Sequence, residues 1–253
     1  MKERPIIFST PMVQAILSGE KTMTRRIKGL DEINKDSEIY QYRGALPPLN
    51  THVFARMWKG NYVETVHINC PYGKPGDHLW VRETFAFTVG EHEPFDTLSY
   101  KADNFHRDIK RVVSDYPESE MCLHGWYDED LSKEVKWRPS IHMPKAIARI
   151  WIEVEEVRVE RLFDISDEDI KAEGVRIPVN NGKVVVRLGV ENSALKFLPQ
   201  KSADIHYTQS EFLFAFWAEL WCKINGRANL DANPWVWVVK FRKILNNGNE
   251  MQS

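Results

Sequence analysis

Residues 146–159, with the sequence AIARIWIEVEEVRV, constrain the fold more than any other part of the chain. Most residues of this run are apolar, and β-branched Ile and Val are common among them. This composition is typical of a β-strand. Because the strand is long, we expect it to bend, as the strands of a closed barrel do.

Further strand signals surround this run, and helices are few. Acidic residues follow Ser166 in the first turn of one helix, and Thr208 with Glu211 forms a capping box at the start of another. Strands and helices do not alternate regularly, which argues against a doubly wound sheet. We therefore predict an α+β fold, a barrel of about six strands with short helices packed at the barrel ends. Strands are predicted at 6–8, 21–27, 53–58, 62–68, 79–84, 146–159 and 235–241, and helices within 9–19, 166–174 and 208–226.

The length of 253 residues fits one large domain or two small ones. We predict a single domain over 1–245 with insertions near 31–50, 88–135 and 178–206, where the strand periodicity is lost. Residues 246–253 are mostly polar, and we predict that they form a flexible tail.

The charge balance is close to neutral, with 34 Lys and Arg residues against 36 Asp and Glu residues and a net charge of -2. A strongly basic domain is therefore excluded, and any nucleic-acid site must be a local patch. The three cysteines form no CxxC pair, which is typical of a reducing compartment. No apolar run approaches the roughly 18 residues of a membrane span. We expect a cytoplasmic protein with no membrane partner.

Three short motifs follow one another along the chain. Gly19-x-Lys21-x-x-x-x-Arg26 comes after the first predicted helix, Lys74-Pro-Gly-Asp77 leads into a strand, and Ala172-Glu-Gly174 ends a capped helix. In this order, and followed by a final aromatic strand, they resemble the ASCH superfamily, whose members are related to the PUA-like barrels that bind RNA. The resemblance implies a PUA-like barrel with a ligand site at its mouth.

Two longer phrases resemble one branch of that superfamily. Residues 71–85 (PYGKPGDHLWVRETF) and 137–144 (WRPSIHMP) are similar to phage and prophage members that are often labelled morphogenetic proteins. That label describes no mechanism. The resemblance covers residues 5–27, 53–85, 137–174 and 208–243.

Some small bacterial ASCH proteins remove the acetyl group from the exocyclic amine of acetylcytidine with a Lys, a Thr and a Glu. The matching residues in this chain are Lys21, Thr24 and Glu173. The resemblance implies that Thr24 is the nucleophile, Lys21 its general base and Glu173 the proton shuttle to the leaving amine. It implies an amidohydrolase for N4-acetylcytidine-type amides that uses no metal and no cofactor.

This scheme sets a condition on the local structure. Strict alternation along a strand over 21–27 would put Lys21 and Thr24 on opposite faces. The two side chains converge only if Lys21 still lies in the turn after Gly19, before the chain joins the sheet. A glycine at that point makes such a turn plausible.

Other side chains near these motifs are candidates for substrate binding. A nucleobase is commonly stacked on an aromatic ring and read by polar groups at its edge. Tyr72 lies in a turn and is the better stacking candidate, whereas Trp80 lies on a strand. The full set of substrate-binding candidates is Thr22, Arg25, Arg26, Tyr72, Trp80, Arg82, Glu83 and Arg138.

Two other functions would use the same place in the fold. A noncatalytic module would bind short RNA or a modified nucleobase, with Lys21, Arg25 and Arg26 holding phosphates. A ribonuclease would use the same lysine and its basic neighbours. On spacing alone, a solvated basic edge with Glu173 as a surface acid is the better explanation of these residues. The near-neutral charge favours a small ligand over a long nucleic-acid track.

Overall fold

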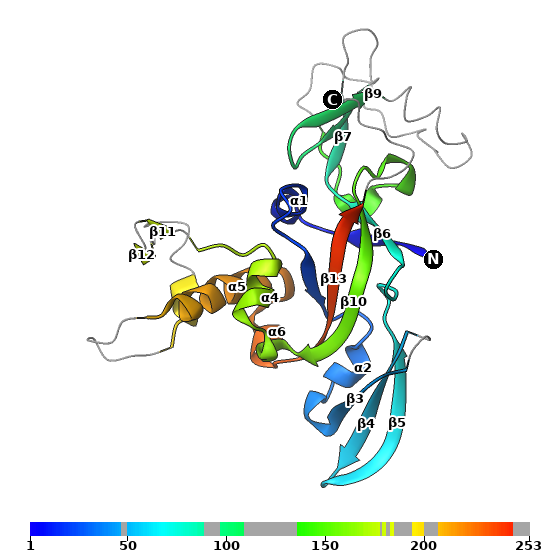
Figure 1. Ribbon diagram of the computed structural model, residues 1–253, viewed down its shortest axis with the longest axis vertical. Helices are drawn as coiled ribbons and strands as arrows, with labels where there is room; N and C mark the ends of the chain where they lie inside the picture. The colour runs from blue at the N-terminus through cyan, green and yellow to red at the C-terminus, as the bar shows by residue number, and fades with distance from the viewer. Residues whose placement is uncertain are drawn as a thin grey trace. The chain divides into compact units, whose positions relative to one another are not determined.

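The computed structural model describes residues 1–46, 50–88, 97–108, 136–177, 179–180, 183–184, 194–199 and 207–244 (Figure 1). The chain separates into two compact units. Unit 1 comprises residues 1–19, 75–155 and 241–253, and unit 2 comprises residues 20–74 and 156–240. Two long strands contribute to both units.

The secondary structure is mostly β, with short helices. The two shared strands are β10 (Trp151–Arg161) and β13 (Trp235–Ile244). Unit 1 also contains β1 (Glu3–Ile7), α1 (Thr10–Leu17), β6 (His78–Arg82), β7 (Phe85–Thr88), β8 (Thr97–Tyr100), β9 (Phe105–Asp108), η3 (Ser140–His142) and η4 (Lys145–Ile147). Unit 2 also contains β2 (Met23–Arg26), α2 (Asp31–Asn34), η1 (Ser37–Ile39), β3 (Tyr40–Leu46), β4 (Thr51–Trp58), β5 (Asn61–Asn69), η5 (Leu162–Asp164), α4 (Asp167–Ala172), β11 (Val179–Asn180), β12 (Lys183–Val184), η6 (Ala194–Phe197), α5 (Gln209–Asn225) and α6 (Arg227–Asp231).

In unit 1, β6 lies between β1, which is parallel to it, and β10, which is antiparallel. The registers place Ile6 beside Val81 and Trp80 beside Trp151. A second sheet has the order β7-β8-β9 and packs against the fully buried side chain of Met143. Trp80 of β6 packs against the same apolar cluster, so the two sheets share it.

In unit 2, β13 is antiparallel to β2, with Trp237 beside Arg26 and Val239 beside Thr24. A separate three-stranded sheet has the order β3-β4-β5. Helix α5 begins at the predicted capping box, in which the Thr208 side chain accepts a hydrogen bond from the Glu211 amide and the Glu211 side chain accepts one from the Thr208 amide. The sequence signal for this helix is confirmed.

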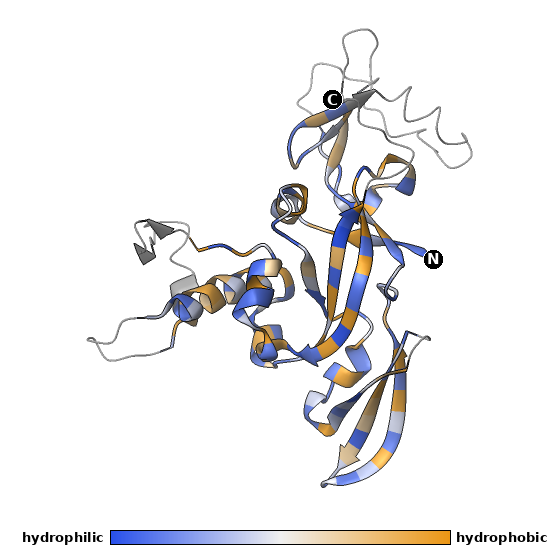
Figure 2. Cartoon of the chain, in the orientation of Figure 1, coloured by the Kyte–Doolittle hydropathy of each residue, from blue (hydrophilic) through white to orange (hydrophobic). Residues whose placement is uncertain are grey.

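The two faces of the β2–β13 pair bury different residues. Met23 and Val238 belong to one apolar cluster with Trp217 of α5. Because alternate residues point to opposite faces, Trp237 lies on the other side, where its ring meets the edge of the His52 ring at a centroid distance of 4.7 Å. Figure 2 shows the corresponding alternation of hydrophobic and hydrophilic residues along β10 and β13.

The α+β class is confirmed. The largest sheet has the order β1-β6-β10-β13-β2, and the strands of the described residues form open sheets with no closed barrel. The chain divides into two compact units, and both contain parts of β10 and β13. The prediction of a single domain over 1–245 stays a prediction. In the part of the chain that the structure describes, no helix is long and apolar enough to cross a membrane.

One sequence expectation needs correction. The predicted loop near 31–50 contains α2, η1 and β3, and β3 pairs with β4. The predicted insertion 88–135 contains β8 and β9, and residues 89–96 and 109–135 lie outside the described residues. The insertion 178–206 contains the antiparallel pair of β11 and β12, which agrees with its interpretation as a hairpin or loop, and η6. Most of its other residues and the predicted tail 246–253 lie outside the described residues.

The long strand also begins later than predicted. Residues 146–150 precede β10, and the amide of Ala148 donates to the carbonyl of Lys145 in a turn. Ala146 and Ile147 are nevertheless buried, against the β7-β8-β9 sheet. Their apolar character reflects this burial and not a place in the strand.

Candidate functional site

The turn after α1 sets the position of Lys21 in unit 2. Gly19 has φ +79°, a left-handed conformation that favours glycine. Lys21 comes two residues later, before β2, and forms an isolated antiparallel bridge with Glu173. The amide of Thr22 donates to the carbonyl of Ala172 at 2.8 Å. The condition that the sequence analysis set for Lys21, a place ahead of the strand, is met.

Helix α4 sets the position of Glu173. The hydroxyl of Ser166 accepts a hydrogen bond from the Asp169 amide at 3.1 Å, which caps the helix start. The helix ends at Ala172, and the amide of Glu173 donates to the carbonyl of Asp169 at 2.9 Å. Asp169 and Glu173 therefore lie one helical turn apart, on one side of α4.

Lys21 and Glu173 meet in a buried environment. The Lys21 side chain has 0% exposed surface, and that of Glu173 has 6%. Lys21 Nζ donates to the backbone carbonyl of Glu173 at 2.9 Å and lies 4.0 Å from Oε2 of its carboxylate. Burial lowers the pKa of Lys21 to about 8; Glu173 opposes this shift, and Arg26 and Arg25 add to it. The amine is therefore far more easily deprotonated than that of an ordinary lysine.

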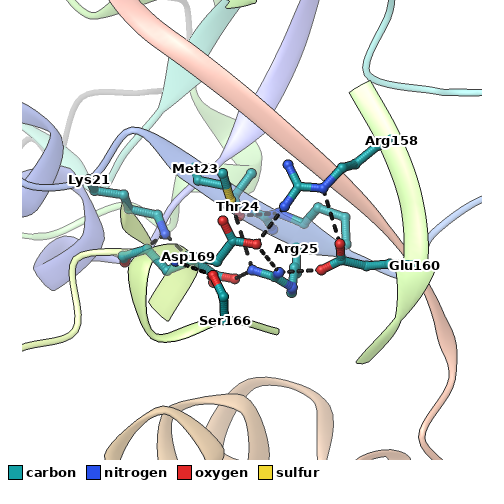
Figure 3. A network of polar contacts seen from close by, with 10 residues as sticks. Lys21, Met23, Thr24, Arg25, Arg158, Glu160, Ser166 and Asp169 are labelled. Atoms are coloured by element: carbon teal, nitrogen blue, oxygen red, sulfur yellow. Dashed lines mark hydrogen bonds and ion pairs between the residues drawn. The ribbon is translucent and has the colours of Figure 1, made fainter. Parts of the chain in front are cut away.

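Arg25 lies at the centre of a cluster of carboxylates. Its Nη1 donates to Glu173 Oε1 at 2.7 Å, and its Nη2 donates to Asp169 Oδ2 at 2.7 Å and to Glu160 Oε1. The side chain has no exposed surface. Figure 3 shows Asp169 and Glu160 around the guanidinium group, with Arg158 on their other side. Arg158 donates to both of these carboxylates.

Thr24 is also buried, on the opposite face of β2. Its Oγ1 accepts a hydrogen bond from Arg26 Nε at 3.2 Å. Met23 and Arg25 share the other face, where Arg25 Nη1 lies 3.9 Å from Met23 Sδ. The predicted alternation along this strand is confirmed.

Tyr72 lies in the electrostatic environment of Arg26 in the same unit. Burial raises the pKa of the Tyr72 hydroxyl, and the positive charge of Arg26 opposes this shift. Two of the substrate-binding candidates, Arg26 and Tyr72, thus interact electrostatically within unit 2. Arg25 lies on the other face of β2, and its guanidinium group is bound by carboxylates.

The remaining candidates lie in unit 1. Arg82 Nε donates to the carbonyl of Met143 at 3.1 Å, and the Arg82 guanidinium lies 5.5 Å from the centre of the Trp80 ring. The carboxylate of Glu83 is buried and bound by Arg149. Arg138 forms an isolated bridge with a residue of β7 through backbone hydrogen bonds. Trp80, Arg82, Glu83 and Arg138 therefore each make their contacts with other residues of unit 1.

Asp169, Glu160 and Arg158 are not among the site residues predicted from the sequence. Two signals were present: Asp169 precedes Glu173 by four positions on a capped helix, and residues 158 and 160 share a face of the long strand.

In the residues that the structure describes, no group of three or more His, Cys, Asp or Glu side chains is arranged to hold a metal ion.

Comparisons with known proteins gave no match: no family model, no curated protein and no solved structure is significantly similar to this chain.

Proposed function

We propose that this protein is an ASCH-type amidohydrolase that deacylates the exocyclic amine of an N4-acetylcytidine-type nucleoside. The observation that carries the proposal is the contact between Lys21 and Glu173, which are 152 positions apart in the chain and meet in a buried site next to the strand of Thr24. The motif order along the sequence supports the family and its PUA-like fold, although the strands of the described residues form open sheets.

Lys21 is suited to act as the general base. With a pKa of about 8, about one molecule in ten carries the neutral amine at pH 7. An unshifted lysine would be neutral in far fewer molecules. The neutral amine takes the proton from the Thr24 hydroxyl as Thr24 attacks.

Thr24 is suited to act as the nucleophile because Arg26 Nε donates a hydrogen bond to its Oγ1. This positive donor stabilises the negative charge that develops on the oxygen during proton loss. Oγ1 then bonds to the acyl carbon of the amide and a tetrahedral intermediate forms. Its collapse breaks the bond between the acyl carbon and the exocyclic nitrogen.

Glu173 carries the proton to the leaving amine. The proton passes from the Lys21 ammonium to Glu173 and then to the exocyclic nitrogen, which leaves as the amine of cytidine. The separation of 4.0 Å between Nζ and Oε2 is longer than a hydrogen bond, and such distances shorten in substrate complexes. Water then hydrolyses the acyl ester on Thr24, releases the carboxylic acid and restores the hydroxyl.

The burial of the basic residues argues against a phosphate-binding module at this place. Lys21 and Arg25 have no exposed side-chain surface, and Arg25 is bound to three carboxylates. A phosphate could reach Arg25 only by displacing these buried ion pairs.

The test is the release of cytidine from N4-acetylcytidine, followed by chromatography. We expect release by the wild-type protein and its loss in Lys21→Met, Thr24→Val and Glu173→Gln. Lys35→Met serves as the control, because Lys35 lies in an exposed ion pair of unit 2. A folded wild-type protein that releases no cytidine would overturn the proposal for this substrate. Titration with short RNA at controlled salt would then test the binding module.

A further inference from the structure

We infer that Arg25 and Asp169 are positioning residues that hold the Glu173 carboxylate away from Lys21, so that the two groups stay in separate proton-transfer roles. This inference rests on the proposed function. It assigns a role to a cluster that the proposed chemistry does not itself use.

The two oxygens of Glu173 have different partners. Oε1 accepts a hydrogen bond of 2.7 Å from Arg25 Nη1, whereas Oε2 lies 4.0 Å from Lys21 Nζ. Lys21 makes its short hydrogen bond with the backbone carbonyl of Glu173 and not with the carboxylate. Arg25 therefore competes with Lys21 for the same buried anion and binds it more closely.

This competition matters because a direct ion pair would disable the base. A carboxylate in hydrogen-bond contact with a buried ammonium stabilises the protonated form. If Arg25 released Glu173, the nearest cation for its carboxylate would be Lys21. Lys21 would then remain protonated at neutral pH and could not accept the Thr24 proton.

Asp169 fixes the other end of the Arg25 guanidinium group. It accepts from Nη2 at 2.7 Å, and Glu160 of β10 accepts from the same nitrogen. A planar guanidinium held by carboxylates on both terminal nitrogens has one orientation. Arg158, which is 31% exposed, donates to Asp169 and Glu160 from outside and compensates part of their charge.

Removing either Arg25 or Asp169 should raise the Lys21 pKa. The charged groups that act on Lys21 are Glu173 at the end of α4 and Arg25 and Arg26 of β2. Arg25→Gln removes a cation and frees Glu173 to pair with Lys21, so the Lys21 pKa rises. Asp169→Asn removes the carboxylate that fixes the Arg25 guanidinium group, so Arg25 holds Glu173 less firmly and the Lys21 pKa rises by a smaller amount.

The experiment measures this pKa directly and, separately, the rate. The ¹³C resonance of the Lys21 Cε is followed against pH in protein with labelled lysine, with Lys21→Met for assignment, and the pH dependence of kcat is recorded with N4-acetylcytidine. We expect Arg25→Gln to raise the Lys21 pKa. Each tenfold increase in the proton affinity of Lys21 should lower kcat at pH 7 by about tenfold. KM should change less than about twofold, because Arg25 has no exposed surface for substrate.

Asp169→Asn should move the Lys21 pKa and the pH profile of kcat upward, because Glu173 can then approach Lys21. Asp231→Asn is the matched control, because Asp231 forms an exposed ion pair with Arg227 on α6. If Arg25→Gln does not fold, Asp169→Asn decides the question alone. A Lys21 pKa in folded Asp169→Asn equal to or below that of the control would overturn the inference, because charge removal without a positioning role lowers the pKa or leaves it unchanged. If the pKa changes while no variant and no wild-type sample releases cytidine, the proposed function fails and the electrostatic arrangement stands.

Discussion

Arg149 binds Glu83 in a bidentate ion pair, in which Nε and Nη2 each donate to one carboxylate oxygen at 2.8 Å. The Glu83 side chain is 1% exposed. Arg149 also donates to Asp103 at 2.8 Å and stacks 4.2 Å from the centre of the Tyr100 ring. One guanidinium thus joins the residue after β6 to the β8–β9 turn of unit 1.

This arrangement predicts a large loss of stability in Arg149→Met. The substitution leaves the Glu83 carboxylate buried without its cation, and breaking a buried pair in this way costs about 3 to 5 kcal/mol. Urea unfolding measures the loss. Arg242→Met is the control, because Arg242 is 58% exposed in its pair with Glu153, and exposed pairs contribute about 1 kcal/mol or less. Equal losses in the two variants would contradict a structural role for the Glu83 pair.

The pKa of Lys21 predicts a pH-dependent contribution to stability. Burial lowers this pKa from 10.5 to about 8 in the folded protein, so between these pH values the unfolded chain binds more protons than the folded one. The free energy of unfolding from this group therefore increases as the pH rises above about 8, by at most about 1.4 kcal/mol per pH unit.

The measurement compares wild type with Lys21→Met by urea unfolding at several pH values from about 7 to about 10, a range that brackets the folded pKa. The difference in unfolding free energy between the two proteins should grow in favour of wild type across this range. Lys35→Met should show a constant difference from wild type, because Lys35 is exposed. A constant difference for Lys21→Met as well would show that Lys21 is not buried as a titrating group.

The parts of this protein that follow local rules could be predicted from the sequence. The helix after Thr208 follows from a capping box within four residues, and the hairpin of β4 and β5 follows from alternation around a tight turn. Lys21 and Glu173 are 152 positions apart, so no local rule predicts that they pair; only the resemblance to ASCH proteins implies that they share a site. The prolines and charges of residues 31–50 favour a loop and so conceal strand β3, although Tyr40 and Tyr42 alternate in it.

The carboxylates around Arg25 could not be predicted in the same way. Glu160, Asp169 and Glu173 lie 135, 144 and 148 positions from Arg25. Their meeting depends on where β2 and α4 pack, and no local pattern encodes that placement. The sequence alone therefore assigns Arg25 to substrate or phosphate, because an arginine next to a second arginine in a short strand is more often solvated than fully buried.

Replacing Gly29 by alanine should lower the free energy of unfolding more than replacing Gly60, another glycine of unit 2. Gly29 has φ +91°, and an added Cβ would lie 3.2 Å from Cγ and Cδ of Pro71. Gly60 has φ +80°, and an added Cβ there meets no atom of the described residues within 4 Å. Both alanine variants lose about 1 to 2 kcal/mol for the left-handed conformation. Gly29→Ala should lose about 1 kcal/mol more for the close approach to the proline ring. Equal losses in urea unfolding would mean that Pro71 moves aside at no cost.

The proposed role of the Thr24 hydroxyl as the nucleophile predicts that Thr24→Ser releases cytidine faster than Thr24→Val. Oγ1 accepts from Arg26 Nε at 3.2 Å, and the residue is 2% exposed. Thr24→Ser keeps the oxygen and loses a buried methyl group, whereas Thr24→Val keeps the shape and loses the oxygen. If Thr24 is the nucleophile, the serine variant should retain about a tenth or more of the wild-type kcat, and the valine variant less than about a thousandth. Cytidine release measures both, and a burst of cytidine before steady state would report the acyl ester on residue 24. Valine activity equal to that of serine would exclude Thr24 as the nucleophile and leave Lys21 to activate a water molecule instead.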